Sequence, residues 1–163
     1  MEAVLRDVTA ADLAAVLTIN EAQVPKVARI PIERVQWFTQ HAHTFRVAVL
    51  DEQIVGFLIA LTPEAAYDSI HFGWFRKQYD RFLYVDRIAL AAAAQQRGIG
   101  RRLYGDLAAV ARREGHERIT AEVNIDPPND ASLAFHRTLG FTEVGTQDAS
   151  GGKRVVLLAQ PIQ

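Results

Sequence analysis

The chain has no cysteine among its 163 residues. This absence excludes disulfide bonds, a thiolate nucleophile and a zinc site built on sulfur, and no other metal-ligand motif is evident. Long apolar runs are also missing, since the longest, Ile88 to Ala94, is far too short to span a membrane. The opening residues, MEAVLRDVTAADL, lack the basic and apolar regions of a signal peptide. We therefore expect a cytoplasmic protein with no membrane partner.

Neither sign of charge dominates the composition. The chain has 18 basic and 19 acidic residues, for a net charge of -1 at pH 7. Such a balance gives no electrostatic reason to bind nucleic acid. Hydrophobic residues make up 49%, which is ordinary for a globular protein, and no internal repeat stands out. We expect residues 1–163 to form a single domain around one core.

The order of hydrophobic patterns predicts an α/β fold. Thr9, with Asp12 three residues later, is typical of a helix start, and Pro31 suits the first turn of a second helix. Residues 62–81 are rich in aromatics but read as irregular. The expected elements are a strand (3–8), two helices (9–23 and 30–42), a hairpin (45–61), a buried strand (82–90), a helix (97–114), a strand (118–124), a helix (129–139) and a final hairpin (141–159). An α/β sandwich with a mixed, mostly antiparallel sheet and one central βαβ unit accounts for this order.

A glycine turn stands at the start of the longest helix pattern. In QQRGIG the spacing is Gln95-x-x-Gly98-x-Gly100. Glycines let the backbone approach a ligand closely, and the first N–H groups of the helix favour an anion such as a pyrophosphate. The alternative is a chance pattern, because glycine is common. A P-loop motif is absent, and Leu103 stands where a dinucleotide fingerprint needs its third glycine.

Two segments together resemble a known family. IALAAAAQQRGIGRRL, residues 88–103, is similar to the acyl-coenzyme A motif of the GNAT superfamily of N-acetyltransferases. NDASLAFHRTLGF, residues 129–141, resembles that family's second signature, and the resemblance covers nearly the whole chain. DSIHFGWFRKQYDRFLYVDRI, residues 68–88, is similar to a string in uncharacterised bacterial members. The resemblance implies a GNAT-like fold whose central βαβ unit binds acyl-CoA, with acetyl-CoA (coenzyme A) as cofactor.

The resemblance also implies where coenzyme A would bind. The pyrophosphate would meet the backbone of the glycine loop, and the pantetheine arm would pair with the strand around Leu90. The N–H of Ile88 would stabilise the oxyanion of the tetrahedral intermediate. Asn129 suits a helix cap equally well. The cofactor-binding residues so implied are Ile88, Leu90, Gln95, Gln96, Arg97, Gly98, Ile99, Gly100, Arg101, Asn124, Asn129, Ser132 and His136.

Acetyl transfer to an amine calls for a base and gains from an acid. An alkyl amine with a pKa near 10.4 is protonated at pH 7, and deprotonating it costs roughly 4.6 kcal/mol. Alternation along residues 82–90 places Tyr84, Asp86 and Ile88 on one face, so Asp86 is either the base, an anchor for the amine, or half of a buried ion pair. His136 stands where many relatives have a tyrosine that protonates the leaving thiolate. It is either that acid or a packed histidine.

The acceptor would be bound by the aromatic segment that precedes the buried strand. This segment could be a lid, a dimer contact or a packed cluster. The substrate-binding residues expected are Tyr67, His71, Trp74, Phe75, Tyr84 and Asp86.

The predicted function is transfer of an acetyl group from acetyl-CoA to a primary amine of a small molecule. Direct attack fits the lack of cysteine, because no thiol is present to carry the acetyl group. Two alternatives remain: a non-catalytic coenzyme A-binding sensor or regulatory module, and a protein N-terminal or lysine acetyltransferase. A homodimer is compatible with the resemblance, since many relatives dimerise.

Overall fold

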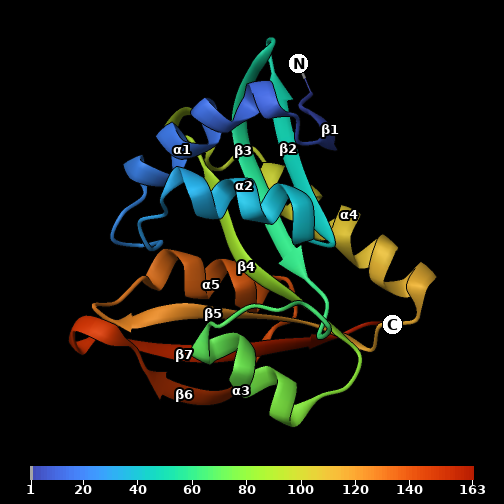
Figure 1. Ribbon diagram of the computed structural model, residues 1–163, viewed down its shortest axis with the longest axis vertical. Helices are drawn as coiled ribbons and strands as arrows, with labels where there is room; N and C mark the ends of the chain where they lie inside the picture. The colour runs from blue at the N-terminus through green and yellow to red at the C-terminus, as the bar shows by residue number, and fades with distance from the viewer. Residues whose placement is uncertain (1) are drawn as a thin grey trace. The chain divides into compact units, whose positions relative to one another are not determined.

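The computed structural model describes residues 2–163. Its strands follow the order β1-β2-β3-β4-β5-β7-β6 (Figure 1). The pairs β1–β2, β2–β3, β5–β7 and β6–β7 are antiparallel, whereas β4 and β5 run parallel. Helix α4 connects β4 to β5. The expected α/β fold with a mostly antiparallel sheet and one central βαβ unit is therefore confirmed.

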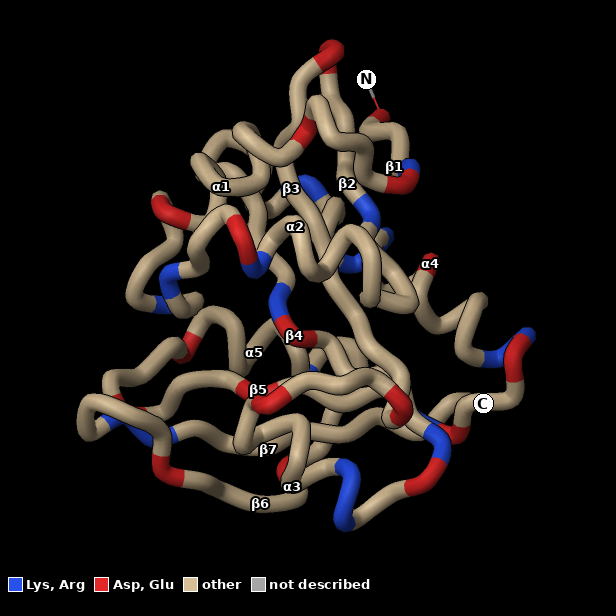
Figure 2. The backbone as a smooth tube through the Cα atoms, viewed as in Figure 1, with Lys and Arg blue, Asp and Glu red and all other residues tan. Residues whose placement is uncertain are grey.

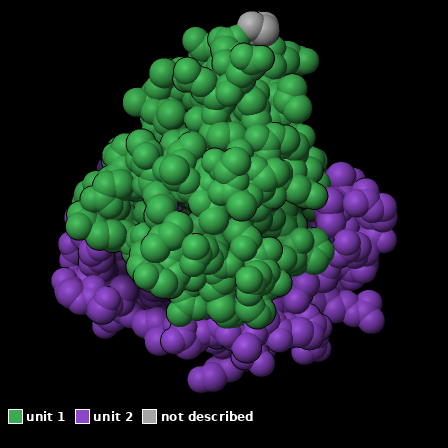
Figure 3. All heavy atoms as spheres, turned by 45° about the horizontal axis from the view of Figure 1, so that its top comes forward, with its two compact units in different colours: residues 1–61, 87–107 green, residues 62–86, 108–163 purple. Residues whose placement is uncertain are grey.

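The chain divides into two compact units (Figure 3). The first comprises residues 1–61 and 87–107, and the second comprises residues 62–86 and 108–163. Strand β4, Phe82–Leu90, and helix α4, Ile99–Glu114, each contribute residues to both units.

The first unit is built around strand β3. The elements that lie wholly within it are β1 (Val4–Asp7), a 3-10 turn (Ala10–Asp12), α1 (Leu13–Ala22), α2 (Ile32–His41), β2 (Thr44–Leu50), β3 (Gln53–Leu61) and a second 3-10 turn (Ala92–Ala94). Residues 57–61 of β3 are all buried, so this end of the strand is covered on both faces. The hairpin between β2 and β3 turns at Asp51 and Glu52, whose φ angles of 51° and 65° match the tight turn expected there.

The second unit contains a helix where the sequence predicted irregular structure. The elements wholly within it are α3 (Ile70–Gln78), β5 (Arg118–Asp126), α5 (Asp130–Thr138), β6 (Thr142–Asp148), a 3-10 turn (Ser150–Gly152) and β7 (Arg154–Pro161). The Ser69 hydroxyl accepts the N–H of Phe72 and so caps α3. Only Phe72 and Phe75 of this helix are fully buried. Its apolar residues, Ile70, Phe72, Trp74 and Phe75, do not lie on one helical face, so the sequence shows no helical period here.

Charges of both signs are interspersed along the backbone of each unit, as the balanced composition implies (Figure 2). No helix among residues 2–163 has the length and apolar character required to cross a membrane.

A capping arrangement at the start of α1 agrees with the sequence prediction. The Asp12 carboxylate accepts the N–H of Thr9 at 2.7 Å and the Thr9 hydroxyl at 3.0 Å. It also accepts hydrogen bonds from both terminal guanidinium nitrogens of Arg6, at 2.7 and 3.0 Å. These donors, the Arg6 guanidinium first among them, lower the pKa of Asp12 to about 2.

We predict that Asp12→Asn lowers the free energy of unfolding by roughly 1–2 kcal/mol at pH 7. Because the folded-state pKa lies below the unfolded one, this contribution exists only where the unfolded carboxyl is ionised. It should therefore shrink as the pH falls from about 4 towards 2. Urea unfolding of the wild-type protein and of Asp12→Asn between pH 7 and pH 2.5 measures this contribution. If the difference in the free energy of unfolding stayed constant across this range, Asp12 would not have the lowered pKa.

Candidate active site

The glycine loop has the backbone conformation of an anion cradle. Gln96 and Gly98 adopt φ angles of 64° and 76°, and α4 begins at the next residue, Ile99. A left-handed φ at a residue other than glycine is uncommon and collects at ligand sites. Residues 95–98 are exposed, and a side-chain carbon at Gly98 would meet nothing within 4 Å. The loop therefore has the conformation and the open space that a pyrophosphate requires at the start of a helix.

The last residues of β4 direct a backbone edge away from β3. The N–H of Ala91 donates to the carbonyl of Val55 on β3 at 2.8 Å. Because backbone groups alternate along a strand, the N–H and C=O of Ile88 and Leu90 point to the opposite side. The Leu90 carbonyl accepts the side-chain amides of Gln23 and Gln95 there, at 3.1 and 3.3 Å. This edge is able to pair with an extended ligand.

Arg87, another residue of β4, has a structural role. The Arg87 guanidinium donates to the side-chain oxygen of Asn20 at 3.0 Å and to the carbonyl of Ala28 at 2.8 Å. Asn20 is 1% exposed and donates its own amide to Ala28 at 3.0 Å. These bonds fix the segment after α1 to β4.

In the second unit, Asp86 is half-buried and bonded to an aromatic residue. The hydroxyl of Tyr67 donates to Oδ1 of Asp86 at 2.5 Å. The structure thus brings together Tyr67 and Asp86, two of the six residues predicted to bind the substrate.

Tyr84 is 1% exposed and donates its hydroxyl to Oε1 of Glu122 at 2.7 Å. Burial raises the pKa of Tyr84 well above its usual range, and the charges of Glu122 and Asp86 raise it further. Glu122 was missed by the sequence prediction. The sequence alone has no signal for it, because the parallel register that pairs Tyr84 with Thr120 is what places Glu122 two residues beyond Thr120, as Asp86 lies two beyond Tyr84.

His136 is packed inside the second unit. It is 3% exposed, and its ring meets Phe141 edge to face with centroids 5.2 Å apart. Its Nδ1 lies 2.8 Å from the carbonyl oxygen of Ser132, which only accepts hydrogen bonds, so Nδ1 carries the proton of the neutral ring. Burial lowers the pKa of His136, and the bond to Ser132 opposes this in part. The imidazole is therefore mostly neutral at neutral pH.

Two asparagines flank the loop before α5. The side chain of Asn129 accepts the N–H of Ser132 at 3.4 Å and caps the helix, which is the structural role that the sequence offered. The carbonyl of Asn124 accepts the N–H of Asn129 at 3.0 Å. Contact of either residue with the pantetheine arm stays a prediction.

The other predicted substrate residues belong to α3. Phe75 is fully buried and packs on Tyr84 with ring centroids 5.8 Å apart. Trp74 covers Gly145 of β6 so closely that a side-chain carbon there would lie 2.9 Å from the indole. Nδ1 of His71 lies 2.7 Å from the side-chain oxygen of Gln147. These contacts favour a packed cluster within the second unit, and a role in substrate binding stays a prediction for all three residues.

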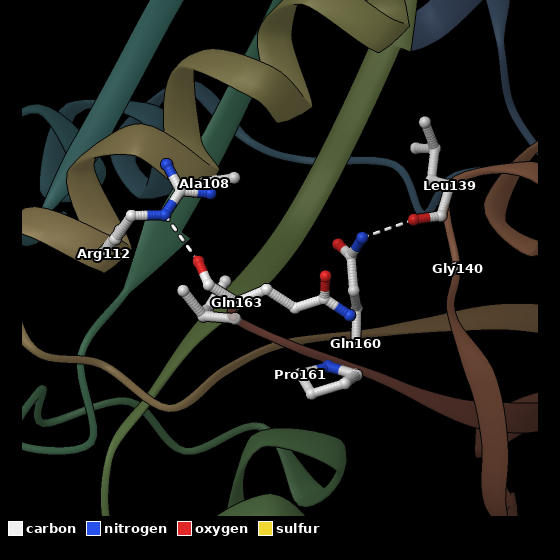
Figure 4. A pocket seen from close by; sticks show the side chains of 8 residues that line it. Ala108, Arg112, Leu139, Gly140, Gln160, Pro161 and Gln163 are labelled. Carbon is white, nitrogen blue, oxygen red and sulfur yellow. Dashed lines mark hydrogen bonds between the residues drawn. The ribbon is translucent and has the colours of Figure 1, made fainter.

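The second unit also has a hollow of about 300 Å³ at the end of β7 (Figure 4). Its polar groups bond within the chain: Arg112 donates to the carbonyl of Gln163 at 2.6 Å, and the Gln160 amide donates to the carbonyl of Leu139. None of the predicted site residues lines it.

Comparisons with known proteins agree with this geometry. The sequence profile described as "Acetyltransferase (GNAT) family" matches residues 13–141. Ard1 from Thermoplasma volcanium is 14% identical, with a TM-score of 0.82 over 100% of this chain and 99% of that chain. A phosphinothricin acetyltransferase from Sinorhizobium meliloti, solved with AcCoA, is 22% identical, with a TM-score of 0.74 over 99% and 89%. A ribosomal-protein-alanine N-acetyltransferase from Brucella melitensis is 25% identical, with a TM-score of 0.72 over 97% and 99%.

A comparison with curated proteins gives no significant match. The family profile alone spans well over half of the chain and includes the glycine loop, all of β4 and the helix that contains His136. With the fold and the loop geometry in agreement, this chain belongs to the acetyltransferase (GNAT) family, whose members are acetyl-CoA-dependent N-acetyltransferases.

Proposed function

We propose that this enzyme transfers the acetyl group of acetyl-CoA to a primary amine of a small molecule by direct attack. The observation that supports it most is the pair of left-handed residues, Gln96 and Gly98, immediately before α4. Left-handed residues of this kind can turn successive N–H groups towards one anion, to which the exposed Arg97 and Arg101 would add positive charge. When bound, acetyl-CoA supplies the activated acetyl group, and the N–H of Ile88 would stabilise the oxyanion.

We assign Asp86 as the base or the anchor of the amine. It lies two residues before Ile88 on β4, so their side chains share one face of the strand. The Tyr67 hydroxyl donates to Oδ1 of Asp86 at 2.5 Å and so holds the carboxylate in one orientation. For His136, burial and the lowered pKa support packing more than acid catalysis.

A small acceptor is favoured over a protein chain by the setting of Asp86. This carboxylate is half-buried and held by an aromatic side chain, whereas a basic protein tail would call for an exposed acidic groove. Relatives act on both kinds of acceptor, since one similar structure is a phosphinothricin acetyltransferase and another acts on a ribosomal-protein alanine. Thiol release from acetyl-CoA, measured with small amines beside peptides that have free N-termini or lysines, decides between them. Turnover confined to the peptides would overturn the small-molecule assignment.

We predict that Gly98→Asn weakens coenzyme A binding about tenfold or more. Asparagine tolerates the left-handed conformation, so folding is largely kept while the side chain fills the open space beside the loop. Isothermal titration with coenzyme A measures the affinity, and Gly105→Asn, at an exposed position of α4, is the matched control. If Gly98→Asn and Gly105→Asn bound coenzyme A with equal affinity, this loop would not be the pyrophosphate site.

We predict that Asp86→Asn lowers kcat about 100-fold, within the range of a general base, and leaves coenzyme A affinity unchanged. His136→Gln should lower kcat less than about tenfold, because a buried neutral imidazole is a poor proton donor at neutral pH. Steady-state thiol release at pH 7.5 measures both. A larger loss in His136→Gln than in Asp86→Asn would restore the histidine as the principal proton-transfer group.

A further inference from the structure

The carbonyl of Leu90, at the end of β4, accepts hydrogen bonds from two glutamine side chains. The amide of Gln23 donates to it at 3.1 Å and the amide of Gln95 at 3.3 Å. A carbonyl oxygen has two lone pairs, so these two donors use its whole capacity as an acceptor. A further N–H group can bond to this oxygen only when one of the two amides leaves it.

The direction of the Leu90 carbonyl is fixed by its contacts with β3. The N–H of Ala91 donates to the carbonyl of Val55 at 2.8 Å. This N–H and the Leu90 carbonyl belong to one planar trans peptide, so they point in opposite directions. The Leu90 side chain lies so close to Gly56 of β3 that any side-chain carbon at Gly56 would clash with it. The carbonyl therefore stays directed at the edge of β4 that faces away from β3, whichever donor it accepts.

Gln23 reaches this carbonyl from a segment that has its own attachment to β4. It is the residue at which α1 ends, and its N–H donates to the carbonyl of Asn20 at 3.0 Å. The Arg87 guanidinium of β4 bonds to the side chain of Asn20 and to the carbonyl of Ala28. Because none of these bonds involves the side-chain amide of Gln23, this amide can leave Leu90 while the backbone of the segment stays in place.

We propose that the side chain of Gln23 competes with the pantetheine arm of coenzyme A for the Leu90 carbonyl, and that it thereby weakens cofactor binding and favours release of the product. This rests on the proposed function and deepens it, because it takes the edge of β4 as the pantetheine site and adds a residue that sets the affinity there. The arm contains amide N–H groups, which are the donors that an unpaired strand edge accepts.

The exchange is close to balanced, since one amide donor replaces another on the same oxygen. The ligand therefore loses the net stabilisation of the bond that it breaks. For one hydrogen bond between a side chain and the backbone, this corresponds to about a threefold to tenfold difference in affinity. Acetyl-CoA and coenzyme A contain the same arm, so Gln23 weakens the binding of both.

Titration of Gln23→Met tests the proposal. Methionine keeps the length of glutamine but has no N–H donor. We expect this variant to bind coenzyme A about threefold to tenfold more tightly than the wild-type protein does. Its affinity for 3′-phospho-ADP, the nucleotide half of coenzyme A without the arm, should be unchanged. Isothermal titration measures both affinities.

Gln40→Met, at an exposed position of α2, is the matched control and should bind both ligands as the wild-type protein does. Gln95 is a poorer choice for substitution, because the glycine loop that it begins is itself predicted to contact the cofactor. Thermal unfolding of each variant checks that it is folded.

The side-chain amide signals of Gln23 give a second measurement, which needs only the wild-type protein. After through-bond assignment, they should move towards the chemical shifts of a solvated glutamine when coenzyme A is added. With 3′-phospho-ADP they should stay in place. This measurement decides alone if Gln23→Met proves unstable.

Several outcomes would overturn the inference. Equal affinities of the wild-type protein and Gln23→Met for coenzyme A would show that the side chain does not compete. Weaker binding by the variant would make Gln23 a contact of the cofactor. An equal gain with 3′-phospho-ADP, or in Gln40→Met, would separate the effect from the edge of β4. Failure of the proposed function looks different, because the wild-type protein would then bind coenzyme A and acetylate no amine, or would not bind it at all.

Discussion

The alternation of residues along β4 is the constraint on which the site depends. Arg87 faces one side of the strand and is bonded to Asn20 and the carbonyl of Ala28, while Asp86 faces the other and is bonded to Tyr67. A slip of one residue would exchange these two side chains and break both sets of bonds, so the register is strongly specified. The same alternation directs the backbone of Ile88 and Leu90 away from β3. Strand β4 thus carries the Asp86 carboxylate and, at its end, a backbone edge that is directed away from β3.

The chemistry that this family performs explains why those two features belong to one strand. A thioester needs an oxyanion donor, and an ammonium needs a group that removes its proton. Asp86 and Ile88 are two residues apart, which fixes their spacing at roughly 7 Å. Because strand geometry sets this distance, it does not depend on the conformation of a loop. In the proposed site the glycine loop would bind the pyrophosphate through its backbone N–H groups rather than through any one side chain.

Local signals in the sequence predicted much of this structure. Thr9 and Asp12 marked a helix start, and the two family signatures identified the acyl-CoA unit. Helix α3 was missed because its apolar residues, Ile70, Phe72, Trp74 and Phe75, do not lie on one helical face. Glu122 was missed because its partner, Tyr84, lies 38 positions away, and only the parallel register of β4 and β5 brings them together. The burial of His136 and the contact between Trp74 and Gly145 also could not be predicted from the sequence, because both follow from tertiary packing.

The central claim is that the amides at the start of α4 bind the pyrophosphate of coenzyme A while the edge of β4 pairs with its pantetheine arm. Amide chemical shifts of the isotope-labelled protein during titration with coenzyme A test it most directly. The account predicts that the largest changes fall on residues 96–101 and on Ile88 and Leu90. Changes concentrated instead around Arg112 and Gln160, at the hollow beside β7, with the loop unaffected, would contradict it.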